Sequence, residues 1–305
     1  MPINNLEFNT KLAGELDKVL VQKAVTGFMT DNGLKPKFIG DKEALIPEMS
    51  LTGAADYDRD NGYVQGSINL TNKSFELTQD RGRSFQLDVM DLDETGVANL
   101  TGQVMGEFVR TQMVPEVDAY VLSKLAGLAV AAGQTVSTDD INKGVYKLIC
   151  EAFNKAEDAA GYGEEELVAF VNPTVYAAIQ SSNELVRQMV VTDFKKAGVD
   201  FKVKAINGVP ILPVSSARMK TAYDFFDGTT DGQEAGGFAP TATAKNIGML
   251  VLPKRAASII RKMEKIRSFS PEINQKANAW RWDYRLFYDV VVKTSMLPTI
   301  FTYTY

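Results

Sequence analysis

The sequence predicts an α+β fold in which a long helix lies beside long strands. Val97, Leu100, Val104 and Phe108 recur at steps of three and four, which is one face of a helix. From Trp280 to Val292 every second residue is aromatic or aliphatic, and charged residues fill many of the gaps, as in a half-buried strand. In the part of the chain between this helix and this strand, short apolar runs alternate with helical patterns, which indicates an α/β region.

Composition sets the first limits on what the chain does. Its 305 residues are enough for one large domain or two moderate ones. The net charge of −5 argues against a dedicated nucleic-acid binder, which usually carries a basic excess. A single cysteine excludes an intrachain disulfide and fits a reducing compartment. No basic and apolar leader opens the chain and no apolar run approaches the roughly 20 residues of a membrane span, so we expect a cytosolic protein without an anchor.

Catalytic motifs are missing from the sequence. The chain contains no histidine, which removes the commonest general base and the commonest metal ligand. It has neither a Walker glycine loop nor a Gly-x-Gly-x-x-Gly after a strand. Ser215 and Ser216 lack the Gly-x-Ser-x-Gly context of a serine hydrolase. We therefore predict no enzymatic activity, no catalytic residue and no cofactor.

Two acidic clusters resemble metal or acid–base sites only superficially. Asp56, Asp58 and Asp60 match the first three ligand positions of a calcium loop, but Asn61 and Ser67 stand where that loop needs glycine and glutamate. A solvated hairpin tip explains them better. Helix capping accounts most simply for a second cluster, which consists of Asp88, Asp91, Asp93 and Glu94. No metal site is predicted.

The first part of the chain predicts an arm followed by a hairpin. A leucine stripe in residues 1–35 suggests a short amphipathic helix that docks on its own body or equally on a neighbouring subunit; it consists of Leu6, Leu12, Leu16 and Leu20. Residues 44–51 and 63–78 then read as two strands around a polar tip, 53–62. The apolar parity changes around Asn72 and Lys73, which suggests a bulge or turn. An isolated hairpin is marginal in water, so this one lies against something else, a partner subunit being a candidate.

The central stretch predicts a strand and then a rod. Phe85, Leu87 and Val89 alternate with polar residues, as in a strand. Asp91 and Glu94 suit a helix start. Pro115 either kinks the helix or opens a second one, and the apolar stripe then continues to Leu128. If both halves are collinear, residues 95–131 form a rod of about 55 Å.

The later segments predict the α/β region and a terminal sheet. A helix opens at Asp139 and Asp140 and continues to residue 159, and a strand at 168–171 leads into a helix after Asn172. The same order repeats as a strand at 209–214 and a helix at 215–226, capped by Ser215 or Ser216. Residues 227–243 are rich in glycine and threonine, so we expect a mobile surface loop. The long strand at 280–292 and the one before it complete a sheet beside the rod.

Charged residues supply the candidate contacts. Residues 254–285 hold nine basic and three acidic side chains, which could face a polyanion or, as we favour, form inter-subunit ion pairs. In Asp80-Arg81-Gly82-Arg83, Gly82 would permit a tight turn between two strands and the arginines could bind carboxylates. Repeated around an assembly, such pairs set subunit orientation. The candidate inter-subunit contacts are Arg59, Arg81, Arg83, Asp56, Asp58 and Asp60.

Three segments of the sequence resemble those of a known family. They are LTQDRGRSFQLDVMDLDET from Leu77, GEFVRTQMVPEVDAY from Gly106 and VPILPVSSARMKTAYDFFDG from Val209. Together with the order of the elements, they resemble tailed-bacteriophage major capsid proteins over most of the chain. The resemblance implies the Hong Kong phage type of capsid fold. In that fold an N-terminal arm and an extended loop reach over neighbours, a peripheral domain carries a spine helix, and an axial domain gathers at the five- and six-fold centres.

Domain boundaries follow from this resemblance. It implies an N-terminal arm at 1–35, an extended hairpin loop at 36–92, the spine helix of the peripheral domain at 93–131 and the axial domain at 132–250. Residues 251–305 would supply long terminal strands to the peripheral sheet and return to the axial domain.

The implied function is structural. Hexamers and pentamers of the chain would build an icosahedral virion shell in the host bacterial cytoplasm and enclose double-stranded DNA without reading its sequence. A portal would be a partner. The chain differs from longer members of the family in having no large N-terminal region that could serve as a built-in scaffold, so we expect either a separate scaffolding protein or a segment already removed. The alternative is an encapsulin-like nanocompartment shell that encloses cargo enzymes. A carboxylate-based hydrolase and a non-assembling binding module are further rivals.

Overall fold

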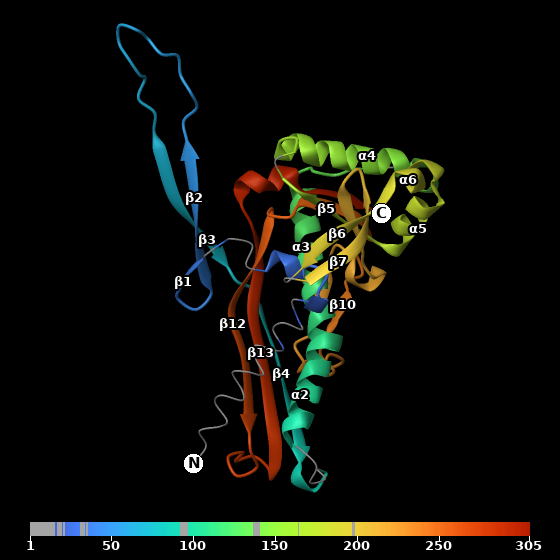
Figure 1. The fold of residues 1–305 in the computed structure, drawn as a ribbon. Coiled ribbons are helices and arrows are strands. Elements are labelled where there is room, and N and C mark those ends of the chain that lie inside the picture. The colour runs from blue at the N-terminus through green and yellow to red at the C-terminus, as the bar shows by residue number, and fades with distance from the viewer. Residues whose placement is uncertain are drawn as a thin grey trace.

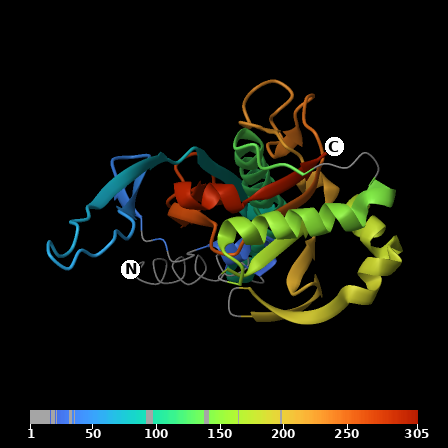
Figure 2. The same ribbon diagram turned by 90° about the horizontal axis from the view of Figure 1, so that it is seen from above.

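The computed structural model describes Leu16, Leu20, 22–30, Leu34, 36–91, 97–136, 141–163, 165–196 and 199–305. A long sheet and a long helix run side by side through the body, and a second sheet with its helices lies at one end (Figure 1). A β-hairpin projects from the body. Seen from above, it leaves on the side opposite the helices of the second sheet (Figure 2).

The long helix is built from three segments that follow one another without a break. They are α2 (Val97–Phe108), the π-helical η3 (Val109–Met113) and α3 (Val114–Ala131). Pro115 lies in the first turn of α3, and just before it the Val114 N–H bonds to the Val109 carbonyl, five residues back. A proline ring would collide with the carbonyl of an ordinary preceding turn, and the wider π turn provides room. The predicted rod is thus confirmed from Val97, with Pro115 opening its second half. Asp93 and Glu94 lie outside the described residues.

The long sheet has the order β12-β13-β4 and is antiparallel throughout. Its strands are β4 (Gln79–Asp88), β12 (Ala257–Phe269) and β13 (Ala279–Val292). The alternation predicted for the last strand is confirmed, because Trp282, Tyr284 and Tyr288 are at most 2% exposed and share one core with the spine helix. This core fixes which face of the sheet turns to the helix.

The predicted turn at Gly82 is wrong. β4 runs straight through Asp80–Arg83, and Gly82 lies opposite Arg285 in the ladder. A Cβ atom on Gly82 would lie 2.6 Å from the Tyr284 carbonyl oxygen. Glycine therefore stands here because two backbones approach closely, which is a use of glycine inside strands that a local turn signal cannot distinguish.

The second sheet has six strands in the order β14-β11-β5-β8-β7-β6, and only β5 and β8 pair in parallel. Its strands are β5 (Leu167–Val171), β6 (Met189–Lys196), β7 (Val199–Ile206), β8 (Val209–Pro213), β11 (Ile247–Pro253) and β14 (Phe301–Thr304). One face shares the core of the spine helix. The other face packs on α4 (Ile141–Ala160) and α5 (Pro173–Ser181), with the short α6 (Asn183–Gln188) following. Because both faces are covered, every residue of β5 is buried.

The α/β prediction is confirmed in its first half. α4 and β5 lie where they were expected, although Asp139 and Asp140 are outside the described residues. α5 begins at Pro173, and the Asn172 Oδ1 atom caps it by accepting the Val175 N–H at 2.9 Å.

The predicted helix at 215–226 is wrong. The chain makes one short turn, η4 (Ser216–Arg218), and then β9 (Tyr223–Phe225), which pairs with β10 (Phe238–Pro240). The Phe238 ring of β10 contacts the rings of Tyr223 and Phe225 of β9, edge-on at 5.3 Å and tilted at 6.2 Å between centroids. Aromatic cross-strand packing thus outweighs the cap signal of the two serines. The segment predicted as a surface loop, 227–243, therefore contains a strand.

The predicted hairpin is present and consists of β2 (Glu43–Leu51) and β3 (Ile68–Glu76), with β1 (Lys37–Ile39) along the outer edge of β2. Its register is continuous from the pair Glu43–Glu76 to the pair Leu51–Ile68, so the predicted bulge is wrong. The extended loop expected at 36–92 is divided between two sheets, since β4 belongs to the long sheet.

Part of the N-terminal arm docks on its own body. Leu16, Leu20 and Met29 are at most 4% exposed and belong to the core of the long helix. The short turn η1 (Gly27–Met29) of the arm contacts β12 and β6. Leu6 and Leu12 lie outside the described residues. Among the helices of the described part, none has the length and apolar content that crossing a membrane requires.

Candidate interaction surface

The root of the hairpin is packed against the long sheet. Ala44, Ile46 and Leu77 are at most 2% exposed and form a separate cluster with side chains of β12 and β13, namely Ile260, Phe287 and Val291. Ala44 and Ile46 point to the same face of β2 because successive side chains of a strand alternate. That face of the root is therefore part of the body.

Polar contacts hold the root in addition to the apolar cluster. The Lys262 ammonium donates to the carbonyl oxygens of Gly40 and Asp41, both at 2.6 Å. At the other edge, Thr294 at the start of η5 (Thr294–Thr299) accepts from the Lys73 ammonium at 2.6 Å, and its N–H donates to Glu48 at 3.2 Å. Contacts within the chain thus reach along the hairpin as far as Glu48 and Lys73.

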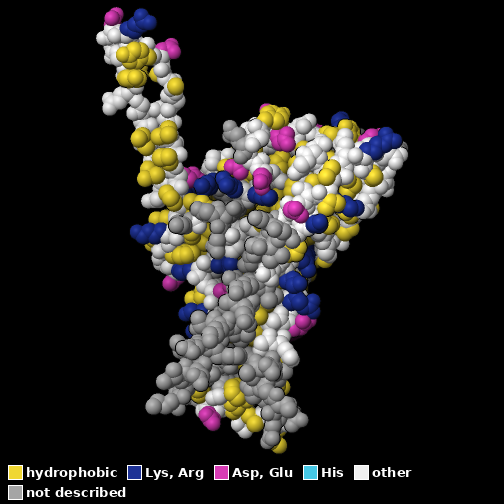
Figure 3. Space-filling view, viewed as in Figure 1, with side chains coloured by type: hydrophobic (Ala, Val, Ile, Leu, Met, Phe, Trp, Pro, Cys, Tyr) yellow, Lys and Arg dark blue, Asp and Glu magenta, His cyan; other side chains and the backbone are white. Residues whose placement is uncertain are grey.

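Beyond these contacts the hairpin exposes a different face. Met49 lies opposite Leu70 and Leu51 opposite Ile68, on the side of the strands that Ala44 and Ile46 do not use. Their exposed fractions are 65% and 67% for the first pair and 62% and 75% for the second. We call these four residues the distal apolar face. Hydrophobic atoms are visible along the stem of the hairpin in Figure 3. Full burial of each such side chain is worth about 1.5 to 3 kcal/mol, so an uncovered cluster marks a place where something else binds.

The tip of the hairpin is ordered by its own turn. Asp58 and Gly62 exchange two backbone hydrogen bonds of 3.2 and 2.7 Å. The Asp58 carboxylate accepts the Asp60 N–H at 2.9 Å and the Asn61 amide at 2.5 Å, and these bonds, the first above all, lower its pKa. The rings of Tyr57 and Tyr63 lie 4.8 Å apart and are 58% and 90% exposed.

Four of the predicted contact residues are therefore exposed together at this tip. They are Asp56, Asp58, Arg59 and Asp60. Their role in contacts between subunits stays a prediction. In the described part of the chain, no three acidic, cysteine or histidine side chains gather in a way that could hold a metal ion.

The other two predicted contact residues lie elsewhere, on β4. Arg81 donates through Nε to Glu116 at 2.5 Å, and to the carbonyl oxygens of Phe226 and Gly237 at 2.9 and 3.3 Å. The Arg81 side chain is 18% exposed and that of Glu116 only 5%. Burial raises the pKa of the Glu116 carboxyl, although Arg81 acts in the opposite direction. Arg81 thus anchors the 226–237 segment to the spine within one chain.

Arg83 differs from Arg81 in its exposure. Its guanidinium donates to the Glu234 carbonyl oxygen at 2.9 Å and otherwise faces an open cavity of about 660 Å³ between β4, the spine and the 226–237 segment. We therefore retain Arg83, but not Arg81, as a proposed contact between subunits.

Sequence reasoning missed the buried acids of the spine. The Asp118 carboxylate is fully buried and accepts the N–H groups of Val25 and Thr26, both at 3.0 Å, and the Thr26 hydroxyl at 2.7 Å. It also pairs with Arg218 at 3.1 Å. One side chain therefore ties the arm and η4 to α3. The available signal was an acid inside a helix that is apolar on nearly every side.

Four of the nine basic residues of the 254–285 segment form ion pairs inside the chain. Ion pairs join Lys254 to Glu166, Arg261 to Glu264, Arg281 to Asp283 and Arg285 to Asp80. For these four residues the expected pairing with another subunit, or with a polyanion, is replaced by pairing with the chain's own acids. The mildly acidic composition supplies those partners.

Comparison with solved structures shows the class of fold, whereas no family model and no curated protein sequence matches the chain. The fold is similar to those of phage capsids, a virus-like particle and an encapsulin, with an extended hairpin, a long helix beside a long sheet and an α/β domain, which confirms the predicted fold class. The capsid protein of cyanophage P-SCSP1u is 14% identical, with 88% of this chain and 84% of that chain covered and a TM-score of 0.54.

Two further structures extend the comparison beyond phages. The virus-like particle from Pyrococcus furiosus is 8% identical, covers 97% of this chain and 99% of its own, and has a TM-score of 0.51. The SrpI encapsulin from Synechococcus elongatus is 13% identical, with coverages of 90% and 88% and a TM-score of 0.50. At such low identities the likeness defines the fold alone.

Proposed function

We propose that this chain is the major capsid protein of a tailed bacteriophage, and that copies of it self-assemble into an icosahedral shell. The observation that carries the proposal is the distal apolar face of the hairpin, which projects from the body with nothing of the described chain against it. Apolar surface of this kind is stabilised by a partner, and in a closed symmetric assembly the partner is another copy of the same chain. Each contact can be weak, because many act together.

The proposal assigns roles to the remaining parts. Subunits gather through the axial domain, 132–250, at the centres of the hexamers and pentamers, while the hairpin and the terminal strands of 251–305 connect neighbouring subunits. The shell encloses double-stranded DNA without sequence-specific contacts, and a separate scaffolding protein and a portal take part in assembly in the host cytoplasm. No residue is assigned a catalytic role. The exposed tip residues Asp56, Asp58, Arg59 and Asp60 contact neighbours.

An encapsulin-like nanocompartment is the second candidate. Its support is the likeness to the SrpI encapsulin, which covers 90% of this chain and 88% of that chain. Both candidates require a closed shell made of one protein. They differ in what the shell encloses.

Electron microscopy of the purified protein tests the shell itself. Closed particles of uniform size support it, and a monodisperse monomer at all concentrations contradicts it. The contents then separate the two candidates when particles are isolated from the native source. Nuclease-resistant double-stranded DNA inside them supports the capsid, whereas an enriched enzyme identified by mass spectrometry supports the nanocompartment.

A further inference from the structure

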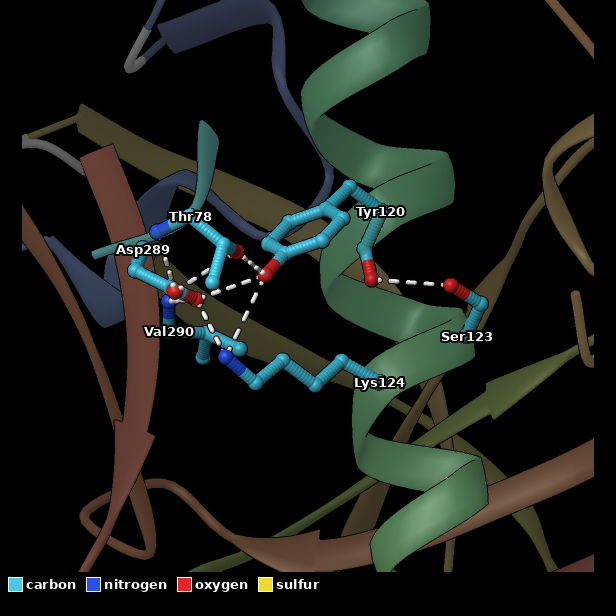
Figure 4. A network of polar contacts seen from close by, with 6 residues as sticks. All are labelled: Thr78, Tyr120, Ser123, Lys124, Asp289 and Val290. Carbon is cyan, nitrogen blue, oxygen red and sulfur yellow. Dashed lines mark hydrogen bonds and ion pairs between the residues drawn. The ribbon is translucent and has the colours of Figure 1, made fainter. Parts of the chain in front are cut away.

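A buried carboxylate collects donors from three parts of the chain. Asp289 of β13 is 1% exposed. Its Oδ2 atom accepts the N–H and the hydroxyl of Thr78, both at 3.0 Å, and its Oδ1 atom accepts the Tyr120 hydroxyl at 2.8 Å and the Val290 N–H at 2.6 Å. The Lys124 ammonium makes an ion pair with Oδ1. Figure 4 shows these groups converging between the spine helix and β13.

Thr78 connects this network to the base of the hairpin. β3 of the hairpin ends at Glu76 and β4 of the long sheet begins at Gln79, so Thr78 lies where the chain passes from one sheet to the other. Tyr120 and Lys124 are four residues apart on α3 and therefore on one side of it. The network thus joins the base of the hairpin to α3 of the spine helix and to β13 of the long sheet.

We propose that Asp289 is a positioning residue that sets the direction in which the hairpin leaves the body. The nine residues of β3 extend for about 30 Å at 3.3 Å each, so a rotation of about 10° at the base moves the far end by about 5 Å. Small errors at Thr78 are thereby amplified at the distal apolar face. The inference concerns the single chain and does not depend on what the hairpin binds.

Only a carboxylate satisfies this site. All of its partners can donate to it. The Thr78 and Tyr120 hydroxyls also lie 2.9 Å apart, but each carries one hydrogen, so a hydroxyl that donates to the carboxylate can only accept from the other. An ionised carboxylate only accepts, whereas an amide carries two N–H donors on one of its ends. In an asparagine, whichever way the amide turns, its NH₂ group meets donors from Thr78 or from Val290 and Lys124. A buried donor without a partner costs enough to displace the group.

The other contacts of the hairpin root cannot replace this one. The cluster around Ile260 and Phe287 is apolar, and apolar contact has no preferred direction. The bonds made by Lys262, Lys73 and Thr294 are exposed to water. Hydrogen bonds to a buried charge are both directional and stronger than exposed ones.

The test measures the direction of the hairpin in the full chain. Spin labels are placed at Tyr57→Cys in the tip and at Tyr146→Cys on α4, in a Cys150→Ser background, and labelled chains are diluted with unlabelled ones. Electron–electron resonance then gives the distance distribution between tip and body. Asp289→Asn is compared with the matched control Asp283→Asn, on the same strand, whose carboxylate pairs with Arg281 and does not touch the hairpin.

The expected result is that D289N widens the distribution about twofold or moves its centre by about 5 Å, the displacement derived from the strand length, while D283N leaves it unchanged. If D289N fails to fold, Thr78→Val removes only the hydroxyl donor and Tyr120→Phe only the phenol, and both are expected to widen the distribution. An unchanged distribution in a folded D289N, or in both of these milder variants, overturns the proposal.

Discussion

Two glycines of this fold behave differently because their surroundings differ. Gly82 has a carbonyl oxygen 2.6 Å from the place a Cβ would take, whereas Gly127, inside α3, has nothing within 4 Å. We expect Gly82→Ala to lower the free energy of unfolding by about 1 to 3 kcal/mol, since the backbones of β4 and β13 must move apart. Gly127→Ala should raise it by about 0.5 to 1 kcal/mol through helix propensity. Denaturant titration of both variants measures the contrast, and equal effects would contradict the close approach.

Glu116 makes stability depend on pH in a defined direction. Because burial holds its pKa above the usual range, the folded chain binds this proton more tightly than the unfolded chain does. The resulting stabilisation is fully present at acid pH and is lost as the pH rises through the raised pKa. We therefore expect the stability difference between wild type and Glu116→Gln to shift in favour of wild type on acidification from pH 7 to pH 4. A shift in the opposite direction, measured by chemical unfolding at both values, would show that Arg81 outweighs burial.

Single residues are where the sequence was least informative. The strand around Gly82 was interpreted as a turn because glycine between charged residues is a local turn signal, and the partner strand is some 200 positions away. The partners of Glu116, Asp118 and Asp289 could not be recognised from the sequence, since they come from distant segments. The exposure of the tip residues could be predicted, because a polar turn between two strands is recognised from the local sequence alone.

At the scale of elements, the arm depends on one carboxylate. Asp118→Asn removes the charge that Arg218 faces and weakens the bonds to Val25 and Thr26. Breaking a buried ion pair by removing one partner costs about 3 to 5 kcal/mol. We expect faster hydrogen exchange at the amides of residues 25 and 26 and a lower unfolding temperature. Glu107→Gln, which alters the exposed pair with Arg110, is the control and should change neither.

The two faces of the hairpin provide the sharpest test of its role. Leu51→Asp combined with Leu70→Asp places charge on the distal apolar face and should abolish assembly without lowering the unfolding temperature of the free chain. Ser50→Asp combined with Asn69→Asp is the matched control, since these residues pair in the same strands but point the other way. Sedimentation velocity distinguishes the outcomes. Normal assembly by the first variant would show that this face is not used.

Elements with a strong local period could be predicted, and those fixed by distant pairing could not. The spine, α4, α5 and the terminal strand follow from their apolar patterns and caps. The helix expected at 215–226 failed because cross-strand aromatic contacts decide that segment. The β6–β7 hairpin was not predicted, since one of its strands forms the edge of the sheet, where Val190 and Val191 remain 66% and 63% exposed and no clear alternation marks it. The parity change in β3 marks two different faces of the hairpin and not a bulge: Phe75 and Leu77 pack against the body, whereas Ile68 and Leu70 are exposed.

At the scale of the whole molecule, the body has a closed apolar core, whereas the far part of the hairpin exposes apolar side chains. Leu16, Leu20, Ala24 and Met29 of the arm are part of the core of the spine, and the root of the hairpin packs on the long sheet. The distal apolar face has no counterpart within the described chain. A single copy thus has a closed core and an uncovered apolar surface, which is what the proposed assembly from identical subunits requires.

Cryo-electron microscopy of particles formed by the purified chain tests this account most directly. The proposed assembly predicts a closed shell in which the distal apolar face of each copy is buried against a neighbouring copy. This face consists of Met49, Leu51, Ile68 and Leu70. Particles in which these four side chains remain in solvent, or a chain that stays single at every concentration, would contradict it.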